Sequence, residues 1–482
     1  MAISAVYGAM QWQGTFGKSW AWRAVLVATA SLGIALPQSA AACSVAPVRA
    51  LFEYDGRTQI VLDVEAAMAR AQAHHGVIPA GAAEEITAMA RVELVPESAF
   101  DEAYAETRHR MVALLRVWRE SLSPMGDQYV HYGATTVDIY GTATVIQMDR
   151  ALAQLDQCLA QSIATMALMA SDHVETPMIG RTLGQHAQPI TFGKKVSTWI
   201  DEYSRHRARI AQVRARLARS AILKGAVGNY SGLGDQAIAV ERSFAAELGL
   251  DGPYTADWNG TRDVLAEAGL VLGLIARSHH RIGQELFLLQ GTDIGEAREA
   301  QRSGVVGSSS MPHKRNPRTP EALVHAGRTI PRLSEVLADD VVNLFERDNT
   351  SRMAPVIEDI TVQSVNAARL LNLLLSGLEV DAEQMRANID RTRGFAMSQA
   401  VAFALGEFMP REEAEALVKQ VIAEALEADI DFNAALLAEA QVTQHLSADR
   451  VAQLLDPERI GQPAIDQVER TVNAAQAEET QP

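Results

Sequence analysis

Apolar residues recur along most of this chain at the spacing of an α-helix. In the stretch 264–289 they fall at three- and four-residue steps, which places them on one helical face. Three long stretches, 190–252, 254–311 and 356–409, contain no proline, a residue that costs a helix interior about 3 kcal/mol. The alternation of apolar and polar residues that predicts a β-strand is scarce. From about Val45 onward the pattern therefore predicts an all-α protein with a long central helix bundle.

Polar stretches that contain glycine divide the predicted helices. They are "GNYSGLGD" at 228–235, "GLDGPYTADWNG" at 249–260 and "GSSSMPHKRNP" at 307–317. Such residues are typical of turns and loops. A chain of 482 residues is also too long for one simple core. We expect a leader, 1–44, an N-terminal helical domain, 45–136, a central helix-bundle domain, 137–352, and a C-terminal helical domain, 353–477.

Composition narrows the classes of partner. Hydrophobic residues make up 48% and charged residues 21% of the chain, as in soluble globular proteins. The formal net charge of -16 argues against nucleic acid or an anionic membrane as the main partner. The net charge does not exclude a small anionic substrate, because a local basic pocket can exist inside an acidic protein.

Cysteine and histidine usage does not indicate a metal site. The only cysteines are Cys43 and Cys158, so we expect neither a disulfide framework nor a cysteine-rich metal site. The twelve histidines are scattered, and none has the HExxH spacing of a zinc ligand pair. The sequence therefore predicts no metal.

The first 52 residues contain no Asp or Glu and read as a secretory signal. Lys18 and Arg23 precede the apolar run 24–36, which is too short to span a bilayer as a helix, and "PQSAAAC" follows it. This order favours export to the periplasm with cleavage after Ala42. A start codon assigned too far upstream or a disordered extension would instead leave a cytoplasmic protein.

Polar residues crowd the start of the segment "HYGATTVDIYGTATVIQ", 131–147. His131, Thr135, Thr136 and Asp138 precede an apolar run with helical spacing. Hydroxyl groups at such a position ordinarily cap a helix. The free N–H groups and the positive dipole at a helix N-terminus also bind carboxylates. Both interpretations stay open for this segment.

Two further segments carry candidate site residues. The segment "GRTLGQHAQPITFGKK", 180–195, puts Thr182, Gln185 and His186 in a turn bounded by glycine and proline. A lone histidine such as His186 is more often a structural residue than an acid. In "ADWNGTRD", 256–263, Arg262 either pairs with a neighbouring carboxylate or contacts a substrate.

Together with the loop 307–317, these segments resemble the fumarase/aspartase superfamily. The loop matches the signature G-S-S-x-M-P-x-K-x-N at every fixed position, and "H-x-G-A-T" and "G-R-T-x-x-Q-H-A-x-P" precede it in the family's order. The resemblance runs from about residue 45 to about residue 475. "ADWNGTRD" and the stretches 62–79 and 377–394 are most similar to the 3-carboxy-cis,cis-muconate cycloisomerase branch. "ETRHRMVAL" (106–114) and "MPHKRNP" are similar to adenylosuccinate lyase.

This resemblance implies an elimination or addition across a carbon–carbon bond next to a carboxylate. In the family the first serine of the loop, here Ser308, removes a proton from carbon, and negative charge builds on the carboxylate as an aci-carboxylate. A serine hydroxyl needs a positive, desolvated setting to act as a base. Lys314 and Asn316 match positions that bind the substrate carboxylate, and we expect Ser309 to contact the substrate as well.

The resemblance also implies three helical domains and a homotetramer whose active sites draw on three chains. That assembly would bring the segments 131–138, 182–188 and 308–316 together around a small anionic carboxylate. The substrate-binding residues expected in the first two segments are His131, Thr135, Thr136, Thr182 and Gln185. The resemblance implies no metal and no organic cofactor.

At the position where part of the family has its general acid, this chain has a different residue. Fumarases and adenylosuccinate lyases have histidine directly after the threonine of "G-R-T", where this chain has Leu183. Members of the cycloisomerase branch also lack that histidine. His186 and His109 are therefore both candidate acids.

The substrate class follows from a departure in "FERDNTSRMAPV", 345–356. Adenylosuccinate lyases bind a nucleotide phosphate there, but this chain keeps only Arg347 and has Arg352 and Val356 at the expected serine and arginine. Phosphate recognition needs several converging donors, so a small di- or tricarboxylate or a substituted succinate is favoured. We expect Arg262 and Arg347 to bind it. The alternatives are a C–N lyase of the adenylosuccinate type and a non-catalytic structural relative.

Overall fold

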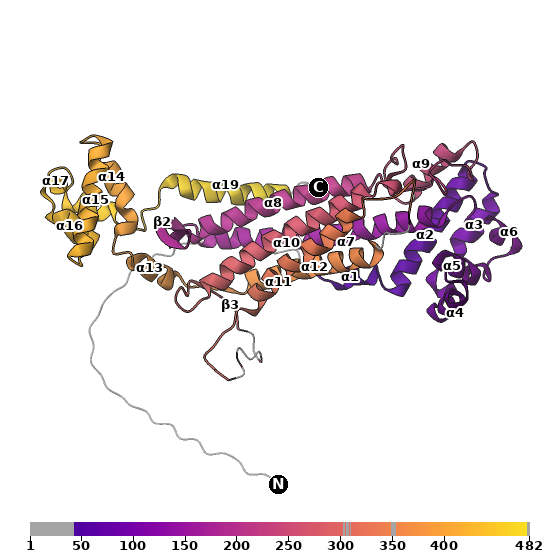
Figure 1. Ribbon diagram of the computed structural model, residues 1–482, viewed down its shortest axis with the longest axis horizontal. Coiled ribbons are helices and arrows are strands. Elements are labelled where there is room, and N and C mark those ends of the chain that lie inside the picture. The colour runs from indigo at the N-terminus through magenta and orange to yellow at the C-terminus, as the bar shows by residue number, and fades with distance from the viewer. Residues whose placement is uncertain (1–42, 302–303, 305–307, 309, 349–352, 480–482) are drawn as a thin grey trace, which may run out of the picture. The chain divides into compact units, whose positions relative to one another are not determined.

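The structure, a computed structural model, describes residues 43–301, 304, 308, 310–348 and 353–479 (Figure 1). The predicted signal sequence, Ser309 and Arg352 lie outside the described residues. Within the described ranges, no helix is long and apolar enough to cross a membrane. In the same ranges, no group of three or more His, Cys, Asp or Glu side chains is placed to hold a metal ion.

The long helices pack side by side around the largest hydrophobic core (Figure 1). They are α7 (Thr136–Asp172), α8 (Phe192–Leu217), α10 (Asp263–Leu289), α11 (Arg318–Asp339), α12 (Met353–Ser376) and α19 (Gln462–Glu479). Helix α10 confirms the apolar face predicted for 264–289, since Leu272, Ile275 and Ile282 are buried there. The predicted all-α class and long central bundle are confirmed.

Glycines allow α10 and α11 to pack closely. A Cβ atom added at Gly273 would lie 2.7 Å from Oγ of Ser334, and one added at Gly327 would lie 2.3 Å from Cβ of His280. These separations leave no room for a side chain, so the close approach of the two helices requires glycine at both positions. The contact positions α11, whose first turn follows directly on the loop 307–317.

A second hydrophobic core lies among the helices before α7 and the helix α9. The elements of this region are α1 (Ala46–Ala50), α2 (Tyr54–His74), α3 (Ala80–Met89), η1 (Val92–Leu94), α4 (Glu97–Thr107), α5 (Arg110–Arg119), α6 (Pro124–Tyr129) and α9 (Ala237–Glu247). Trp118 of α5 is fully buried there, and its indole N–H donates to the carbonyl of Met89 at 2.7 Å. This bond joins α5 to the end of α3.

A third core joins the helices from α14 to α18. The remaining elements are α13 (Ala382–Asp390), η3 (Phe395–Met397), α14 (Ser398–Leu405), α15 (Arg411–Glu427), α16 (Phe432–Ala438), α17 (Ala440–Thr443), α18 (Ala448–Leu454) and η2 (Trp258–Gly260). Strand β1 (Pro177–Thr182) pairs with β2 (Gln185–Thr191), and β3 (Ala297–Glu299) pairs with β4 (Leu378–Val380). Both pairs are antiparallel.

Helices α12 and α19 come after the predicted domain boundary at residue 352, yet they pack in the core of the central bundle. The three-domain division stays a prediction.

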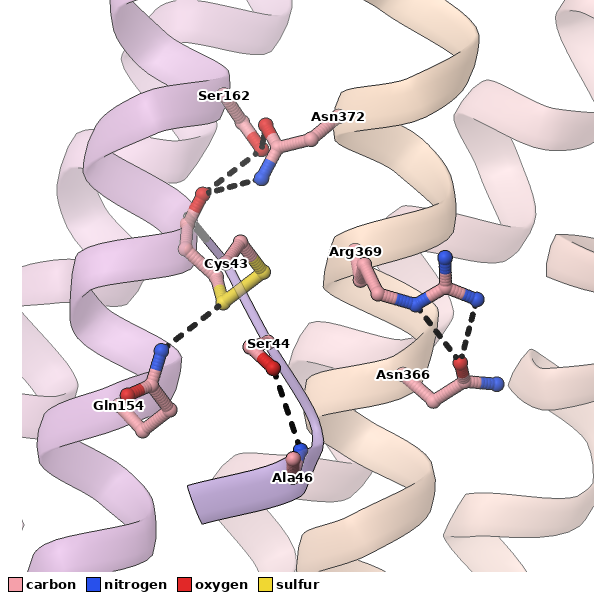
Figure 2. Close-up of a disulfide and its surroundings, with 9 residues drawn as sticks. Cys43, Ser44, Ala46, Gln154, Ser162, Asn366, Arg369 and Asn372 are labelled. Atoms are coloured by element: carbon pink, nitrogen blue, oxygen red, sulfur yellow. Dashed lines mark hydrogen bonds between the residues drawn. A yellow bond between two sulfur atoms is a disulfide. The ribbon is translucent and has the colours of Figure 1, made fainter. Parts of the chain in front are cut away.

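A disulfide corrects the expectation drawn from the cysteine count. Cys43 and Cys158 are bonded, with an S–S distance of 2.03 Å, so the segment before α1 is tied to α7 (Figure 2). Beside the bond, Asn372 of α12 donates to the carbonyl of Cys158 at 3.0 Å and accepts from the hydroxyl of Ser162 at 2.7 Å. The two cysteines are separated by 115 residues, and the tertiary fold, in which α1 packs against α7 and α12, brings them together.

Candidate active site

The segment 131–138 contains the N-terminus of α7. The residues that cap this helix already form hydrogen bonds within the protein. Thr135 is the N-cap residue, and its backbone N–H donates to Oδ2 of Asp138 at 2.9 Å in a capping box. Asp138 is fully buried and also accepts from the backbone N–H groups of Lys224 at 3.0 Å and Gly225 at 3.1 Å. Burial raises the pKa of Asp138, although these donors oppose the rise. Thr135 is thus a cap, and the substrate contacts expected of Thr135 and Thr136 stay predictions.

His131 forms a buried pair with a carboxylate that sequence spacing did not indicate. Its Nδ1 lies 2.6 Å from Oε1 of Glu65 on α2, and the Glu65 side chain is only 1% exposed. Burial disfavours the protonated ring, but the charge and hydrogen bond of Glu65 outweigh it and raise the pKa of His131. His131 also has a left-handed backbone with φ of 58°. Its position is therefore held by both its backbone and Glu65.

A cavity of about 710 Å³ lies beside the first turns of α7. We call it the arginine cavity; its lining includes Tyr104, Arg110, Tyr140, Trp258, Arg262 and Arg347. Among the described residues of its lining, only Asp348 carries a carboxylate, which lies 3.4 Å from the guanidinium of Arg262. The cavity is a local basic site in a chain whose formal net charge is -16.

The two arginines predicted to bind substrate differ in their contacts. Arg262 is only 3% exposed, and its Nη2 donates to Oδ1 of Asn343 at 3.1 Å and to the carbonyl of Asp348 at 3.2 Å. These contacts make Arg262 an anchor for the segment after α11, and its predicted contact with substrate stays a prediction. Arg347 lines the cavity, and its buried Nη1 has no hydrogen-bond partner among the described residues.

The hairpin β1–β2 carries Thr182, Gln185 and His186. Its turn is formed by Leu183 and Gly184, both with left-handed backbones at φ of 52° and 78°. A second cavity of about 800 Å³, the hairpin cavity, lies against it. The lining of the hairpin cavity includes Gln185, His186, Gln188, Arg391, Thr392 and Arg393.

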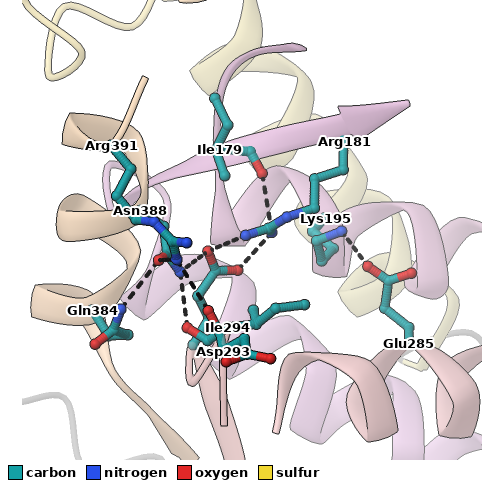
Figure 3. A network of polar contacts seen from close by, with 10 residues as sticks. Ile179, Arg181, Lys195, Glu285, Asp293, Ile294, Gln384, Asn388 and Arg391 are labelled. Carbon is teal, nitrogen blue, oxygen red and sulfur yellow. Dashed lines mark hydrogen bonds and ion pairs between the residues drawn. The ribbon is translucent and has the colours of Figure 1, made fainter. Parts of the chain in front are cut away.

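A network of polar contacts around one buried ion pair holds this hairpin against α13 (Figure 3). Arg181 donates to both oxygens of the buried Glu296 at 2.8 and 2.7 Å, and Asn388 donates to the same carboxylate at 2.8 Å. Arg391 donates to the carbonyl of Asp293 at 3.1 Å. Such a bidentate, buried pair fixes the geometry of the hairpin.

The same network affects His186. Burial lowers the pKa of His186, and the positive charges of Arg181 and Arg391 lower it further against the opposing charge of Glu296. The ring is therefore neutral at pH 7 and suits hydrogen bonding better than proton donation. The other candidate acid, His109, caps α5 by accepting from the backbone N–H of Val112 at 3.3 Å. Both assignments as acid stay predictions.

The loop before α11 is described in part. Ser308 accepts through Oγ from the backbone N–H of Met311 at 3.2 Å, and the backbone N–H of Lys314 donates to the carbonyl of Met311 at 3.0 Å. The carbonyl of Asn316 accepts from the backbone N–H of Arg318, the first residue of α11. Lys314 is exposed.

Within one chain, the predicted site residues lie in separate places. The start of α7 and Arg347 meet at the arginine cavity, and Gln185 and His186 line the hairpin cavity. No described residue of the loop lines either cavity. Sequence reasoning missed Arg110 and Tyr140, which line the arginine cavity. Two signals could have pointed to Arg110: it lies in the family-like stretch 106–114, and it follows directly on the candidate His109.

Comparison with known proteins identifies two family models in this chain. A model described as lyase matches residues 43–331, and one described as adenylosuccinate lyase C-terminus matches residues 394–471. The first match contains the quoted stretches 131–147, 180–195, 256–263 and 307–317, and the second match follows it along the chain.

Individual relatives span nearly the whole chain. A 3-carboxy-cis,cis-muconate cycloisomerase of Pseudomonas aeruginosa is 38% identical over 86% of this chain and 90% of the relative. An N-acetyl-S-(2-succino)cysteine lyase of Dickeya dadantii is 33% identical over 85% of this chain and 90% of the relative. The crystal structure of the 3-carboxy-cis,cis-muconate lactonizing enzyme from Pseudomonas putida is 33% identical, with a TM-score of 0.82, and covers 90% of this chain and 97% of its own.

Proposed function

Because the chain belongs to the lyase family of the fumarase/aspartase superfamily and is an enzyme, we propose that it is a lyase or cycloisomerase of a small di- or tricarboxylate. The favoured substrate is 3-carboxy-cis,cis-muconate or a close analogue. The 38% identity to a cycloisomerase over 86% of the chain supports this choice. No step requires a metal or an organic cofactor.

The proposed reaction begins at the loop before α11. Ser308 removes a proton from the carbon next to a substrate carboxylate, and the electron pair of the broken C–H bond moves into that carboxylate. Lys314 and Asn316 stabilise the resulting aci-carboxylate by charge and hydrogen bonding. The aci-carboxylate then collapses to a double bond and expels the substituent on the neighbouring carbon. In the reverse direction the same groups serve addition or ring closure.

The observation that carries this proposal is the complete signature loop, which keeps Ser308, Lys314 and Asn316 within a chain of this family. The test compares Ser308→Ala with Ser310→Ala, a serine two positions along the same loop. We expect Ser308→Ala to lower kcat by several powers of ten and Ser310→Ala to change it little. Turnover is followed by ultraviolet absorbance with 3-carboxy-cis,cis-muconate. Near-normal kcat in Ser308→Ala would refute the serine as base.

A second candidate is elimination from a substituted succinate to give fumarate. The N-acetyl-S-(2-succino)cysteine lyase relative, 33% identical, supports it. Adenylosuccinate is the less favoured member of this class, because the segment 345–356 keeps only Arg347 of the expected phosphate contacts. Parallel assays with 3-carboxy-cis,cis-muconate, N-acetyl-S-(2-succino)cysteine and adenylosuccinate separate these choices. Absence of activity with all three carboxylates would contradict both candidate reactions.

We also propose that the active enzyme is a homotetramer with sites shared between chains. The distribution of the site segments over separate cavities in one chain supports this assembly. Helix α10 also exposes apolar side chains on its outer face, with Leu270, Leu274 and Leu288 at 52%, 46% and 54% exposure. An exposed apolar stripe of this kind is typical of a helix that packs against another chain.

We propose export as the reason for the leader. Disulfides persist in oxidising compartments, and the bond between Cys43 and Cys158 supports folding there. N-terminal sequencing of protein from the native cell is expected to start near Cys43, with no alkylatable thiol before reduction. An intact Met1 on active protein would contradict the proposal.

A further inference from the structure

Arg110 and Tyr140 line two neighbouring cavities, and neither residue was given a role from the sequence, although both lie in stretches quoted above. Both line the arginine cavity of about 710 Å³. Both also line a neighbouring cavity of about 420 Å³, together with Arg57 and Thr144. Any anion that enters either space therefore meets these two side chains.

The Arg110 guanidinium is held in place without a carboxylate. It lies over the ring of Phe100 at 5.8 Å and interacts with the Tyr140 phenol. No ion pair joins Arg110 to an acidic side chain among the described residues. Arg57, by contrast, lies 3.4 Å from Glu358, and Arg262 is 3.4 Å from Asp348. Among the described residues, Arg110 thus has charge left for a ligand, and so does Arg347, for which no ion pair is found either.

Tyr140 adds a neutral donor at the same place. Burial raises the pKa of Tyr140, although the charge and hydrogen bond of Arg110 oppose the rise. The phenol therefore keeps its proton at neutral pH and can donate it in a hydrogen bond. A guanidinium beside a protonated phenol is suited to the two oxygens of one carboxylate.

Unpaired donors elsewhere in the lining of the arginine cavity point to the same ligand chemistry. Trp258 is 5% exposed, and its indole N–H has no hydrogen-bond partner among the described residues. The same holds for the buried Nη1 of Arg347. A buried donor without a partner is costly and rare in native proteins, so an acceptor-rich ligand in this cavity is favoured.

We propose that Arg110 and Tyr140 bind a second carboxylate of the substrate, away from the carbon that loses its proton, and so select polycarboxylates. This inference rests on the proposed function for the identity of the substrate. Trp258 and Arg347, which line the same cavity, contribute further donors to the same anion. The loop residues act on the reacting carboxylate, whereas this pair acts on substrate affinity.

The test measures binding apart from turnover. Tricarballylate, a stable tricarboxylate, is titrated calorimetrically into the full-length protein and into Arg110→Gln, Tyr140→Phe and Arg116→Gln. Arg116 lies on the same helix and its removal changes the net charge equally, but it lines neither cavity and pairs with Glu106 at the surface. We expect Arg110→Gln to weaken binding roughly tenfold to a hundredfold, and Tyr140→Phe several-fold, with Arg116→Gln within twofold.

Several results would overturn the inference. Equal weakening in Arg110→Gln and Arg116→Gln would mean that only long-range charge matters. Unchanged binding in Arg110→Gln, or no binding of tricarballylate to the parent protein, would remove the subsite. Because Tyr140→Phe deletes one oxygen only, it also tests the site if Arg110→Gln fails to fold. Failure of the proposed function is distinguished by Ser308→Ala, which should lose turnover while binding tricarballylate normally.

Discussion

The buried ion pair between Lys224 and Glu241 offers a quantitative test of the fold around the start of α7. Lys224 Nζ lies 2.6 Å from Oε1 of Glu241 and 2.7 Å from the hydroxyl of Tyr230, and the side chains of the pair are 1% and 5% exposed. The backbone N–H groups of Lys224 and Gly225 also hold Asp138, which caps α7. Glu241→Ala leaves the ammonium group buried without its counter-charge.

The expected loss of stability is large because an unpaired buried charge is costly. Breaking a buried pair by removing one partner costs about 3–5 kcal/mol, which corresponds to roughly 6–20 °C in Tm at about 2–4 °C per kcal/mol. The matched control is Glu247→Ala on the same helix, because Glu247 pairs with Arg70 where both side chains are more than a third exposed. Such a partly exposed pair contributes about 0–1 kcal/mol.

The assay is thermal unfolding followed by far-UV circular dichroism at one fixed protein concentration, since assembly makes Tm depend on concentration. The double variant Lys224→Met/Glu241→Leu removes both charges and should recover most of the stability lost in the single variant. Two outcomes would refute the reasoning. One is a Glu241→Ala variant as stable as Glu247→Ala, and the other is a double variant no more stable than Glu241→Ala.

Three further predictions concern catalysis, pH and assembly. Lys314→Ala should raise KM and lower kcat together, and the fall in kcat/KM should correspond to roughly 2–4 kcal/mol of lost transition-state stabilisation. Lys314→Arg should restore little of this loss. Unchanged steady-state kinetics would exclude Lys314 from the site. Burial lowers the pKa of His206 to about 4 and of His279 to about 3. Both values lie below the ordinary 6.5, so the unfolded chain binds more protons below pH 6.5 and stability should fall by roughly 2–4 kcal/mol from pH 7 to pH 5. Denaturant midpoints measure this, and the variant His206→Gln/His279→Gln should show a flatter profile. Sedimentation should give four chains per particle, and a fully active monomer would contradict shared sites.

The sequence alone determined the features that depend on local pattern. The spacing of apolar residues across 264–289 requires a helix with one buried face, because 3.6 residues per turn return each of them to the same side. The polar stretches at 228–235 and 249–260 lie between helices, on either side of α9, for the equally local reason that residues typical of turns do not continue a helix. The loop 307–317 was recognisable because its residues are consecutive in the chain.

Tertiary structure decided every feature that joins distant residues. The bond between Cys43 and Cys158, the pair of His131 with Glu65 and the approach of Arg110 to Tyr140 each connect positions whose separation follows no period. The contacts of Arg262 could not be predicted from the sequence either. Only the folded structure shows that its guanidinium forms ion pairs with Asp340 and Asp348. The charge and burial that tune a side chain come from the helices packed against it, and these neighbours are set by the folded core rather than by the residues on either side in the chain.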